Sequence, residues 1–245
     1  MPRQQVILIV AMVVFICSGL AFLGGLGLGF GLKDTLEPAT AEPAPTLTAS
    51  PAAYRPVERP APAGQLLLDE NFSQPVWEQR QDDEHSKRYK NGQYIIAVEA
   101  TGYSFWSVAG ETFADFILEV DTVQRRGPED NDYGVILRRQ DDANFYSFEI
   151  SGDGYYIFTK LVDDELLEII PWQESQAIRR GDRTNRLRVE AVGPNFTFYI
   201  NDELVDSAID SDFVQGDIGL LVGTYEEAGV EVGFDNLKVW AVEDR

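Results

Sequence analysis

The chain has 245 residues, enough for one membrane anchor and one domain with a single hydrophobic core. Its formal net charge of -21 lies entirely in residues 65–245, because residues 1–64 carry four basic and four acidic side chains. Nucleic acid and anionic lipid surfaces are disfavoured as partners of this acidic part, since both recruit Lys and Arg clusters. Neutral sugars, cations and basic surfaces remain as partners.

The chain holds a single cysteine, Cys17, and a single histidine, His85. A disulfide within one chain is therefore impossible, and zinc sites built from Cys and His are largely excluded. Nucleophilic catalysis by Cys or Ser with a histidine base is largely excluded for the same reason. Any catalysis would depend on carboxylates, Tyr or Lys.

An uncharged and almost wholly apolar run extends from Val6 to Leu32, and it exceeds the roughly 20 residues that span a bilayer as a helix. The run predicts a transmembrane helix over 6–32 after a short cytoplasmic N-terminus, residues 1–5. A cleaved signal peptide is the alternative, although its apolar region usually covers only about 7 to 15 residues. Arg3 and the amino terminus precede the run, so the positive-inside bias favours a cell-membrane protein with an extracytoplasmic C-terminal domain.

Small residues recur within this run at a spacing of four: Ala21, Gly25 and Gly29. Such a spacing lets two membrane helices approach closely, which predicts a homodimer formed through the anchor. The alternative is that Gly is simply frequent in membrane spans.

Residues 33–64 contain seven of the twelve prolines and show no apolar periodicity. A segment of this composition does not bury enough surface to fold, and Pro keeps it extended. The segment is predicted to be a disordered Pro/Ala-rich stalk between the anchor and a folded domain, residues 65–245. A proline-rich ligand for a recognition domain is the other interpretation.

From Gln65 onward, short runs typical of β-strands alternate with turn residues, and no long stretch shows a helical period. The predicted strands are residues 65–72, 92–99, 104–109, 115–124, 133–140, 144–151, 154–161, 165–170, 185–193, 195–201, 203–209, 216–224 and 230–242. One helical turn is predicted near residues 172–178. So many short strands predict an all-β, two-sheet antiparallel jelly-roll sandwich, with a barrel as the alternative.

Three stretches resemble the concanavalin A-like lectin and glucanase superfamily. "LLLDENF" looks like the opening strand of family 16 glycoside hydrolases, and "DNDYGVILRRQDDANFYSFEISGDGYY" is similar to the central strands of laminin-G-like and 3-keto-disaccharide-hydrolase-like domains. "NRLRVEAVGPNFTFYINDELV", followed by "GDIGLLVGT" and "VGFDNLKVW", looks like their common ending. The resemblance covers nearly all of residues 65–242 and implies a carbohydrate-binding or glycan-cleaving domain.

In the family 16 enzymes the catalytic strand reads Glu-x-Asp-x-Glu, with or without one inserted residue. "EVDTVQ" keeps Glu119 and Asp121 but offers Val123 or Gln124 where the proton donor belongs. Glutamine cannot protonate a leaving oxygen, so this mechanism is predicted to be disabled. The simpler interpretation of Glu119 and Asp121 is a solvated strand face.

A sugar-binding face needs aromatic rings and planar polar groups. A hairpin register that places Gln140 opposite Asn144, and Glu149 opposite Tyr156, would bring Arg139, Glu149 and Tyr156 onto one ligand-facing sheet near Trp106. These four residues, Trp106, Arg139, Glu149 and Tyr156, are the predicted carbohydrate-binding residues. A slip of one residue would reverse the assignment of faces, and an ordinary salt-linked outer face is the alternative.

Calcium suits an acidic domain without cysteine, because it takes carboxylate and carbonyl oxygens. The resemblance implies a structural calcium held by an acidic residue of the first strand and an aspartate of the last, which here are Glu70 and Asp235. The loop with Glu129, Asp130 and Asp132 is a second candidate, although acids in a turn are usually just solvated.

Three functions follow from these patterns. The first is a membrane-anchored module that binds polysaccharide or another extracellular ligand without cleaving it. The second is a glycoside hydrolase or lyase-like enzyme that uses Glu149 or Glu119. The third is an adhesive or assembly role through protein contacts.

Overall fold

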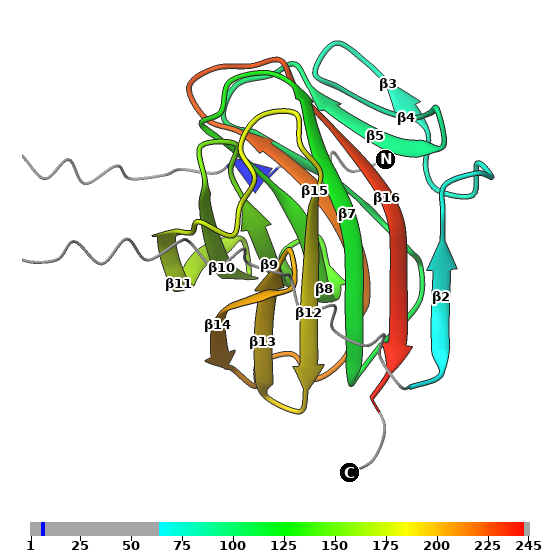
Figure 1. Ribbon diagram of the computed structural model, residues 1–245, viewed down its shortest axis with the longest axis vertical. Helices are drawn as coiled ribbons and strands as arrows, with labels where there is room; N and C mark the ends of the chain where they lie inside the picture. The colour runs from blue at the N-terminus through cyan, green and yellow to red at the C-terminus, as the bar shows by residue number, and fades with distance from the viewer. Residues whose placement is uncertain (1–5, 8–63, 243–245) are drawn as a thin grey trace, which may run out of the picture. The chain divides into compact units, whose positions relative to one another are not determined.

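The computed structural model describes residues 6–7 and 64–242, and in these residues the chain is entirely β-structure, turns and irregular segments (Figure 1). The strands are β1 (Val6–Ile7), β2 (Leu66–Glu70), β3 (Arg80–Gln81), β4 (His85–Lys90), β5 (Gln93–Val98), β6 (Tyr103–Val108), β7 (Phe116–Arg126), β8 (Asn131–Asp141), β9 (Asn144–Ile150), β10 (Tyr155–Val162), β11 (Glu165–Glu174), β12 (Asn185–Val192), β13 (Asn195–Ile200), β14 (Glu203–Ile209), β15 (Asp217–Thr224) and β16 (Val230–Ala241).

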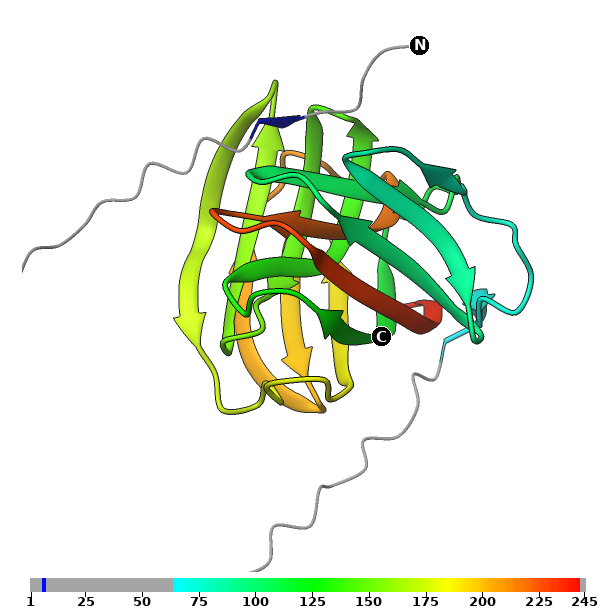
Figure 2. The same cartoon turned by 90° about the horizontal axis from the view of Figure 1, so that it is seen from above.

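The strands form two antiparallel sheets, which Figure 2 shows from above. The seven-stranded sheet has the order β1-β6-β15-β8-β9-β10-β11. The nine-stranded sheet has the order β14-β13-β12-β7-β16-β5-β4-β3, with β2 also paired to β16. Strands distant in sequence are neighbours, as β15 is between β6 and β8, and this arrangement is consistent with a jelly-roll sandwich.

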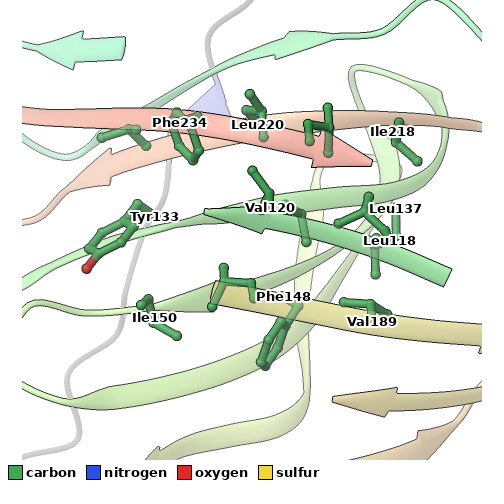
Figure 3. Close-up of a cluster of buried hydrophobic side chains, with 14 of the residues drawn as sticks. Leu118, Val120, Tyr133, Leu137, Phe148, Ile150, Val189, Ile218, Leu220 and Phe234 are labelled. Atoms are coloured by element: carbon green, nitrogen blue, oxygen red, sulfur yellow. The ribbon is translucent and has the colours of Figure 1, made fainter. Parts of the chain in front are cut away.

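The main hydrophobic core lies between the two sheets. Side chains alternate along each strand, so Leu118 and Val120 of β7 point inward while Glu119 points outward. Figure 3 shows how residues from both sheets meet in this core. Phe148 of β9 stacks on Phe198 of β13, with ring centroids 4.6 Å apart. Burial of these rings is the principal force that holds the sheets together.

The thirteen strands predicted from Gln65 onward are confirmed, but the sequence missed β3 and β4. The stretch around β4 is highly charged, yet His85 and Lys87 are buried. The His85 ring stacks on Phe105 with centroids 3.9 Å apart, and Lys87 Nζ donates to the Glu78 carboxylate and to the backbone oxygen of Trp106. These partners come from distant parts of the chain, so the local polarity gave no indication of a strand.

The predicted helical turn near residues 172–178 is wrong. Residues 172–174 continue β11, and residues 176–177 form a turn. Pro171 lies within β11, which is tolerated because β11 is an edge strand and its open side needs no backbone donor.

Most of the predicted membrane span and the whole stalk up to residue 63 lie outside the described residues. Val6 and Ile7, at the start of the span, form β1 and pair with Ser104 and Tyr103 of β6. Among residues 6–7 and 64–242, no helix has the length and apolar character needed to cross a membrane.

Candidate functional site

The candidate site lies on the outer face of the seven-stranded sheet, the face turned away from the main core. Tyr133, Ile150 and Tyr156 form one row across β8, β9 and β10, and all three belong to the main core. Asp132 precedes Tyr133, and Tyr155 precedes Tyr156. Because side chains alternate along a strand, Asp132 and Tyr155 therefore lie on the outer face. They lie at the same end of β8 and β10, since both strands are antiparallel to β9.

Glu149 lies between these two residues on the same outer face. Its backbone pairs with Gly134 of β8 on one side and with Ile157 of β10 on the other. It is therefore a diagonal neighbour of Asp132 and of Tyr155, a spacing of about 7 to 8 Å that long side chains bridge. We call Asp132, Glu149, Tyr155 and Tyr225 the acidic end of the face.

The two carboxyl groups of the acidic end are buried: Asp132 is 4% exposed and Glu149 is 6% exposed. Tyr225 follows β15, and its hydroxyl donates to Asp132 Oδ2 at 2.7 Å. The other oxygen, Asp132 Oδ1, is buried and has no well-formed hydrogen bond among the described residues, although the backbone N–H of Gly223 lies close to this carboxylate. Buried polar atoms normally have partners, so an oxygen of this kind indicates a ligand or a water molecule.

The position of the Asp132 carboxylate depends on a glycine in the neighbouring strand. Gly223 of β15 pairs with Asp132, and a Cβ at Gly223 would lie 1.8 Å from Asp132 Oδ1 and 2.6 Å from Ser104 Oγ. Any side chain at this position would displace the carboxylate. Gly223 therefore allows Asp132 Oδ1 to lie against β15 and close to the Ser104 hydroxyl.

Burial changes the protonation of this cluster. Burial raises the pKa of Asp132 to about 6, although the Tyr225 hydroxyl and the Gly223 backbone N–H have a lowering effect. Burial, and next the neighbouring Asp132, raise the pKa of Glu149 to about 8. Two carboxyl groups with separated pKa values can divide the roles of proton donor and proton acceptor.

The outer face also carries a second hydrophobic cluster beside the acidic end. It consists of Trp106, Ile136, Phe145, Leu161 and Leu221, and Trp106 lies 5.6 Å from Phe145 between ring centroids. Trp106 pairs with Leu221, Leu221 with Gly134, and Gly134 with Glu149, so Trp106 and Glu149 are in one row.

Unpartnered polar atoms concentrate in this sheet. Among the described residues, four buried side-chain atoms lack a hydrogen-bond partner: Asp132 Oδ1, Trp106 Nε1, Arg139 Nε and His85 Nδ1. The first three belong to β6 and β8, and His85 Nδ1 lies 3.1 Å from Asp82 Oδ1. Asp132 and Arg139 are seven residues apart in β8, so these atoms are spread over the sheet, and Asp132 Oδ1 is the one within the acidic end.

Tyr155 supplies the exposed aromatic ring of the acidic end, with 36% of its surface exposed. Further acids surround the cluster, because burial and then Asp153, Glu226 and Glu227 raise the pKa of Asp130. These acids come from the turns next to β8, β9 and β15. The acidic end therefore combines a rim of several acids with one accessible ring, and the Arg180 side chain lies against Gly154 beside that ring.

The four predicted binding residues have different surroundings in the structure. Trp106 and Glu149 lie on the outer face. Arg139 follows a distortion in β8 and is bound to Asp142. Tyr156 points into the main core, where its hydroxyl donates to the Val205 backbone oxygen at 3.2 Å.

The predicted hairpin register was off by one residue. Glu149 pairs with Ile157 rather than Tyr156, and Asn144 pairs with Asp141 rather than Gln140. Because of this shift, Tyr155 lies on the outer face and Tyr156 lies in the core. Sequence reasoning missed Tyr155, Asp132 as a partner of Glu149, and Tyr225. The adjacent tyrosines of "GYY" were the only signal for Tyr155.

Glu119 and Asp121, the remnant of the family 16 pattern, lie on the outer face of the nine-stranded sheet. Arg188 Nη1 donates to Glu119 at 2.9 Å, and Arg186 Nε donates to Asp121 at 2.9 Å. These acids point away from the core, as the simpler interpretation predicted, but they are held in cross-strand ion pairs and their side chains are only 18% and 14% exposed rather than freely solvated. They are on a different sheet from Glu149.

The residues predicted to hold calcium, Glu70 and Asp235, make hydrogen bonds to nearby backbone N–H groups. Glu70 Oε1 accepts the Phe72 backbone N–H at 2.6 Å, and Asp235 Oδ1 accepts the Asn236 N–H at 2.7 Å. Within the described part of the chain, no group of three or more His, Cys, Asp or Glu side chains is arranged to hold a metal. Calcium stays a prediction, and thermal melting with and without a chelator tests it.

The fold and the match to a sequence family define the class of this protein. The two sheets are those of the concanavalin A-like lectin and glucanase superfamily. Residues 65–239 match the family described as 3-keto-alpha-glucoside-1,2-lyase-like domain, and the chain belongs to that family. No curated protein matches the sequence.

Solved structures share this fold at low sequence identity. A protein with a galectin-like fold from Bacillus subtilis is 12% identical, with a TM-score of 0.56, over 74% of this chain and 98% of that chain. An endo-β-galactosidase from Clostridium perfringens is 14% identical, with a TM-score of 0.51, over 76% of this chain and 64% of that chain. The carbohydrate-binding module CBM66 from Bacillus subtilis is 21% identical, with a TM-score of 0.48, over 74% and 99%.

Proposed function

We propose that this domain binds carbohydrate, without cleaving it, at the acidic end of the outer face of the seven-stranded sheet. The observation that carries the proposal is the exposed ring of Tyr155 beside a buried carboxyl pair that has one unpartnered oxygen. The family description names a glucoside, which supports a sugar as the ligand class.

The chemistry of the acidic end suits a sugar. The ring of Tyr155 offers an apolar face for the C–H side of a pyranose, while its hydroxyl remains available for hydrogen bonding. Asp132 Oδ1 can accept a hydrogen bond from a sugar hydroxyl, which would satisfy an otherwise unpartnered oxygen. The several acids of the rim disfavour anionic polysaccharides, so the ligand class is a neutral glycan.

We expect Tyr155→Ala to weaken glycan binding by about tenfold, which corresponds to about 1.4 kcal/mol, because the stacking surface is lost. The matched control is Tyr199→Ala, which removes a partly exposed ring from β13 of the other sheet. Binding is measured on a glycan array and then by titration calorimetry, with and without calcium. Equal loss in both variants, or no loss at Tyr155, contradicts the proposed site.

A second function, cleavage of a glycosidic bond, is favoured by one observation: Asp132 and Glu149 have separated pKa values, as acid and base pairs in enzymes do. Cleavage releases sugar products, whereas binding leaves the glycan intact. Incubation of the protein with the glycans that it binds, followed by analysis of released sugars, distinguishes them. Release that Glu149→Gln abolishes establishes an enzyme, and binding without release supports a binding domain. A flat array together with capture of a protein partner would support the adhesive role.

We also propose that residues 6–32 anchor the domain outside the cell and that residues 33–64 act as its stalk. The length and apolar character of the run support this proposal. Membrane fractionation and N-terminal sequencing of the mature protein test it, since a cleaved signal peptide would leave a chain without this run.

A further inference from the structure

An exposed ion pair flanks the ring of Tyr155. Glu174 of β11 pairs directly with Tyr155 of β10, so both side chains lie on the outer face of the seven-stranded sheet. Arg180, from the loop between β11 and β12, donates from Nη2 to Glu174 Oε1 at 3.1 Å. The side chains of Arg180 and Glu174 are 51% and 52% exposed, so a ligand in solution can reach both.

The glycine before Tyr155 makes room for the guanidinium of Arg180. Gly154 adopts φ 98°, a conformation that residues with a side chain rarely adopt. A Cβ on Gly154 would lie 2.7 Å from Arg180 Nε and 2.9 Å from Arg180 Nη2. The guanidinium therefore lies against the backbone of Gly154 and reaches Glu174, and these two residues are the chain neighbour and the cross-strand neighbour of Tyr155.

The loop that carries Arg180 is fixed in place by buried groups. Ile178 is 6% exposed and packs in the main core. The backbone N–H of Arg179 donates to Oδ1 of the fully buried Asn185 at 2.8 Å, and Asn185 Nδ2 donates to the backbone oxygen of Arg179 at 3.0 Å. Arg183 Nε donates to the backbone oxygen of Arg180 at 3.1 Å. Because its backbone is already ordered, Arg180 can contact a ligand at a low cost in conformational entropy.

The ion pair itself contributes little to stability. Two half-exposed charges are screened by water, and holding two long side chains in one geometry costs entropy. Both groups keep capacity for a ligand. A guanidinium carries several N–H donors in one plane, and the bond to Glu174 uses one of them. A carboxylate has several acceptor positions on its two oxygens, and Arg180 uses one of these.

We propose that Arg180 and Glu174 form a specificity-determining subsite beside Tyr155, which recognises two adjacent hydroxyl groups of the sugar that stacks on the ring. Arg180 donates to one sugar oxygen, and Glu174 accepts from the neighbouring hydroxyl. The charges of the pair cancel, so the subsite suits the neutral glycan of the proposed function, on which this inference rests. The subsite adds donors and acceptors from β11 and its loop to the groups of the acidic end.

The subsite is tested by titration calorimetry of the full chain, purified in detergent, with gluco-oligosaccharides. We expect Arg180→Ala and Glu174→Ala each to weaken binding by about tenfold to a hundredfold, as expected for the loss of a hydrogen bond to a charged group. The matched control is Arg186→Ala, which removes an exposed, ion-paired arginine of the other sheet and should leave the affinity unchanged. Equal affinities in the parent, Arg180→Ala and Glu174→Ala overturn the subsite.

A set of ligands shows whether the two side chains contact the sugar or only position Tyr155. The probes are gluco-oligosaccharides that each lack one ring hydroxyl. We expect removal of either of two adjacent hydroxyls to weaken binding by the parent. Removal of one of them should have little further effect in Arg180→Ala, and removal of the other little further effect in Glu174→Ala, because the contact is already lost. If every deoxygenated probe loses the same factor in the parent and in both variants, the subsite is overturned.

Arg180→Lys gives a second test of the geometry. Lysine keeps the positive charge but lacks the planar arrangement of donors, so we expect this variant to recover only part of the affinity that Arg180→Ala loses. Full affinity in Arg180→Lys would show that charge alone is needed and would overturn the recognition of paired hydroxyls.

Failure of the proposed function is distinguishable from failure of this inference. If the parent binds no gluco-oligosaccharide, both are wrong. If Tyr155→Ala weakens binding while Arg180→Ala and Glu174→Ala bind as the parent does, the proposed function stands and the subsite is wrong.

Discussion

Raising the pH from about 5 to about 9 is expected to lower the free energy of unfolding by several kcal/mol. Burial raises the pKa of Glu149 from 4.5 to about 8 in the folded protein. The proton is therefore bound more tightly in the folded state, so this contribution to stability is complete below about pH 4.5 and is lost as the pH rises through 8. Each unit of displaced pKa is worth about 1.4 kcal/mol, and Asp132 adds to the effect between its ordinary value and about 6.

Urea unfolding at a series of pH values measures this dependence. In Glu149→Gln the group is neutral at every pH, so the stability should decline much less between pH 5 and pH 9, the range that brackets its pKa of about 8. Glu119→Gln, which alters an ion-paired acid of the other sheet, should keep the slope of the parent. A parent protein whose stability is level or rises over this range would contradict the buried, protonated state of Glu149.

Phe198→Ala is expected to destabilise the domain by about 3 to 5 kcal/mol, because it leaves a cavity in the main core. Phe198 is fully buried, stacks on Phe148 at 4.6 Å and lies 4.5 Å from Phe158 between ring centroids. Phe198, on β13 of the nine-stranded sheet, thus contacts β9, which carries Glu149, and β10. A loss of this size is a large fraction of the 5 to 15 kcal/mol that typical domains possess.

The urea midpoint of Phe198→Ala, compared with that of the parent, measures the loss. The matched control is Leu204→Ala in the neighbouring strand β14, where the side chain is 63% exposed and the change should stay within about 0.5 kcal/mol. A loss below about 1 kcal/mol at Phe198 would show that the two sheets do not depend on this aromatic contact.

The sequence by itself determined the class of fold and the direction of most side chains. Alternation of apolar and polar residues in a strand has a period of two, so Leu118 and Val120 could be assigned to the core and Glu119 to a wet face without any tertiary information. The same reasoning assigned Tyr146, Phe148 and Ile150 to the core and Glu149 to the outer face. Turn residues between these runs then required antiparallel pairing.

The tertiary structure alone decided the register and the composition of the acidic end. Arg138 adopts φ 49°, and its buried guanidinium donates to the backbone oxygens of Ala114, Gly193 and Phe213. This distortion of β8 changes the pairing of the hairpin, and no local pattern encodes it, because its partners are distant in sequence. The register of the next hairpin, β9 with β10, is regular, and it decides that Tyr155 rather than Tyr156 faces outward.

Asp132, Glu149 and Tyr225 come from three strands or their ends, and β15 inserts between β6 and β8 only in the folded sheet. Each residue looks like an ordinary polar residue in its own segment. Their shared burial and their effects on one another's pKa arise from sheet order, a property that depends on long-range pairing rather than on local periodicity.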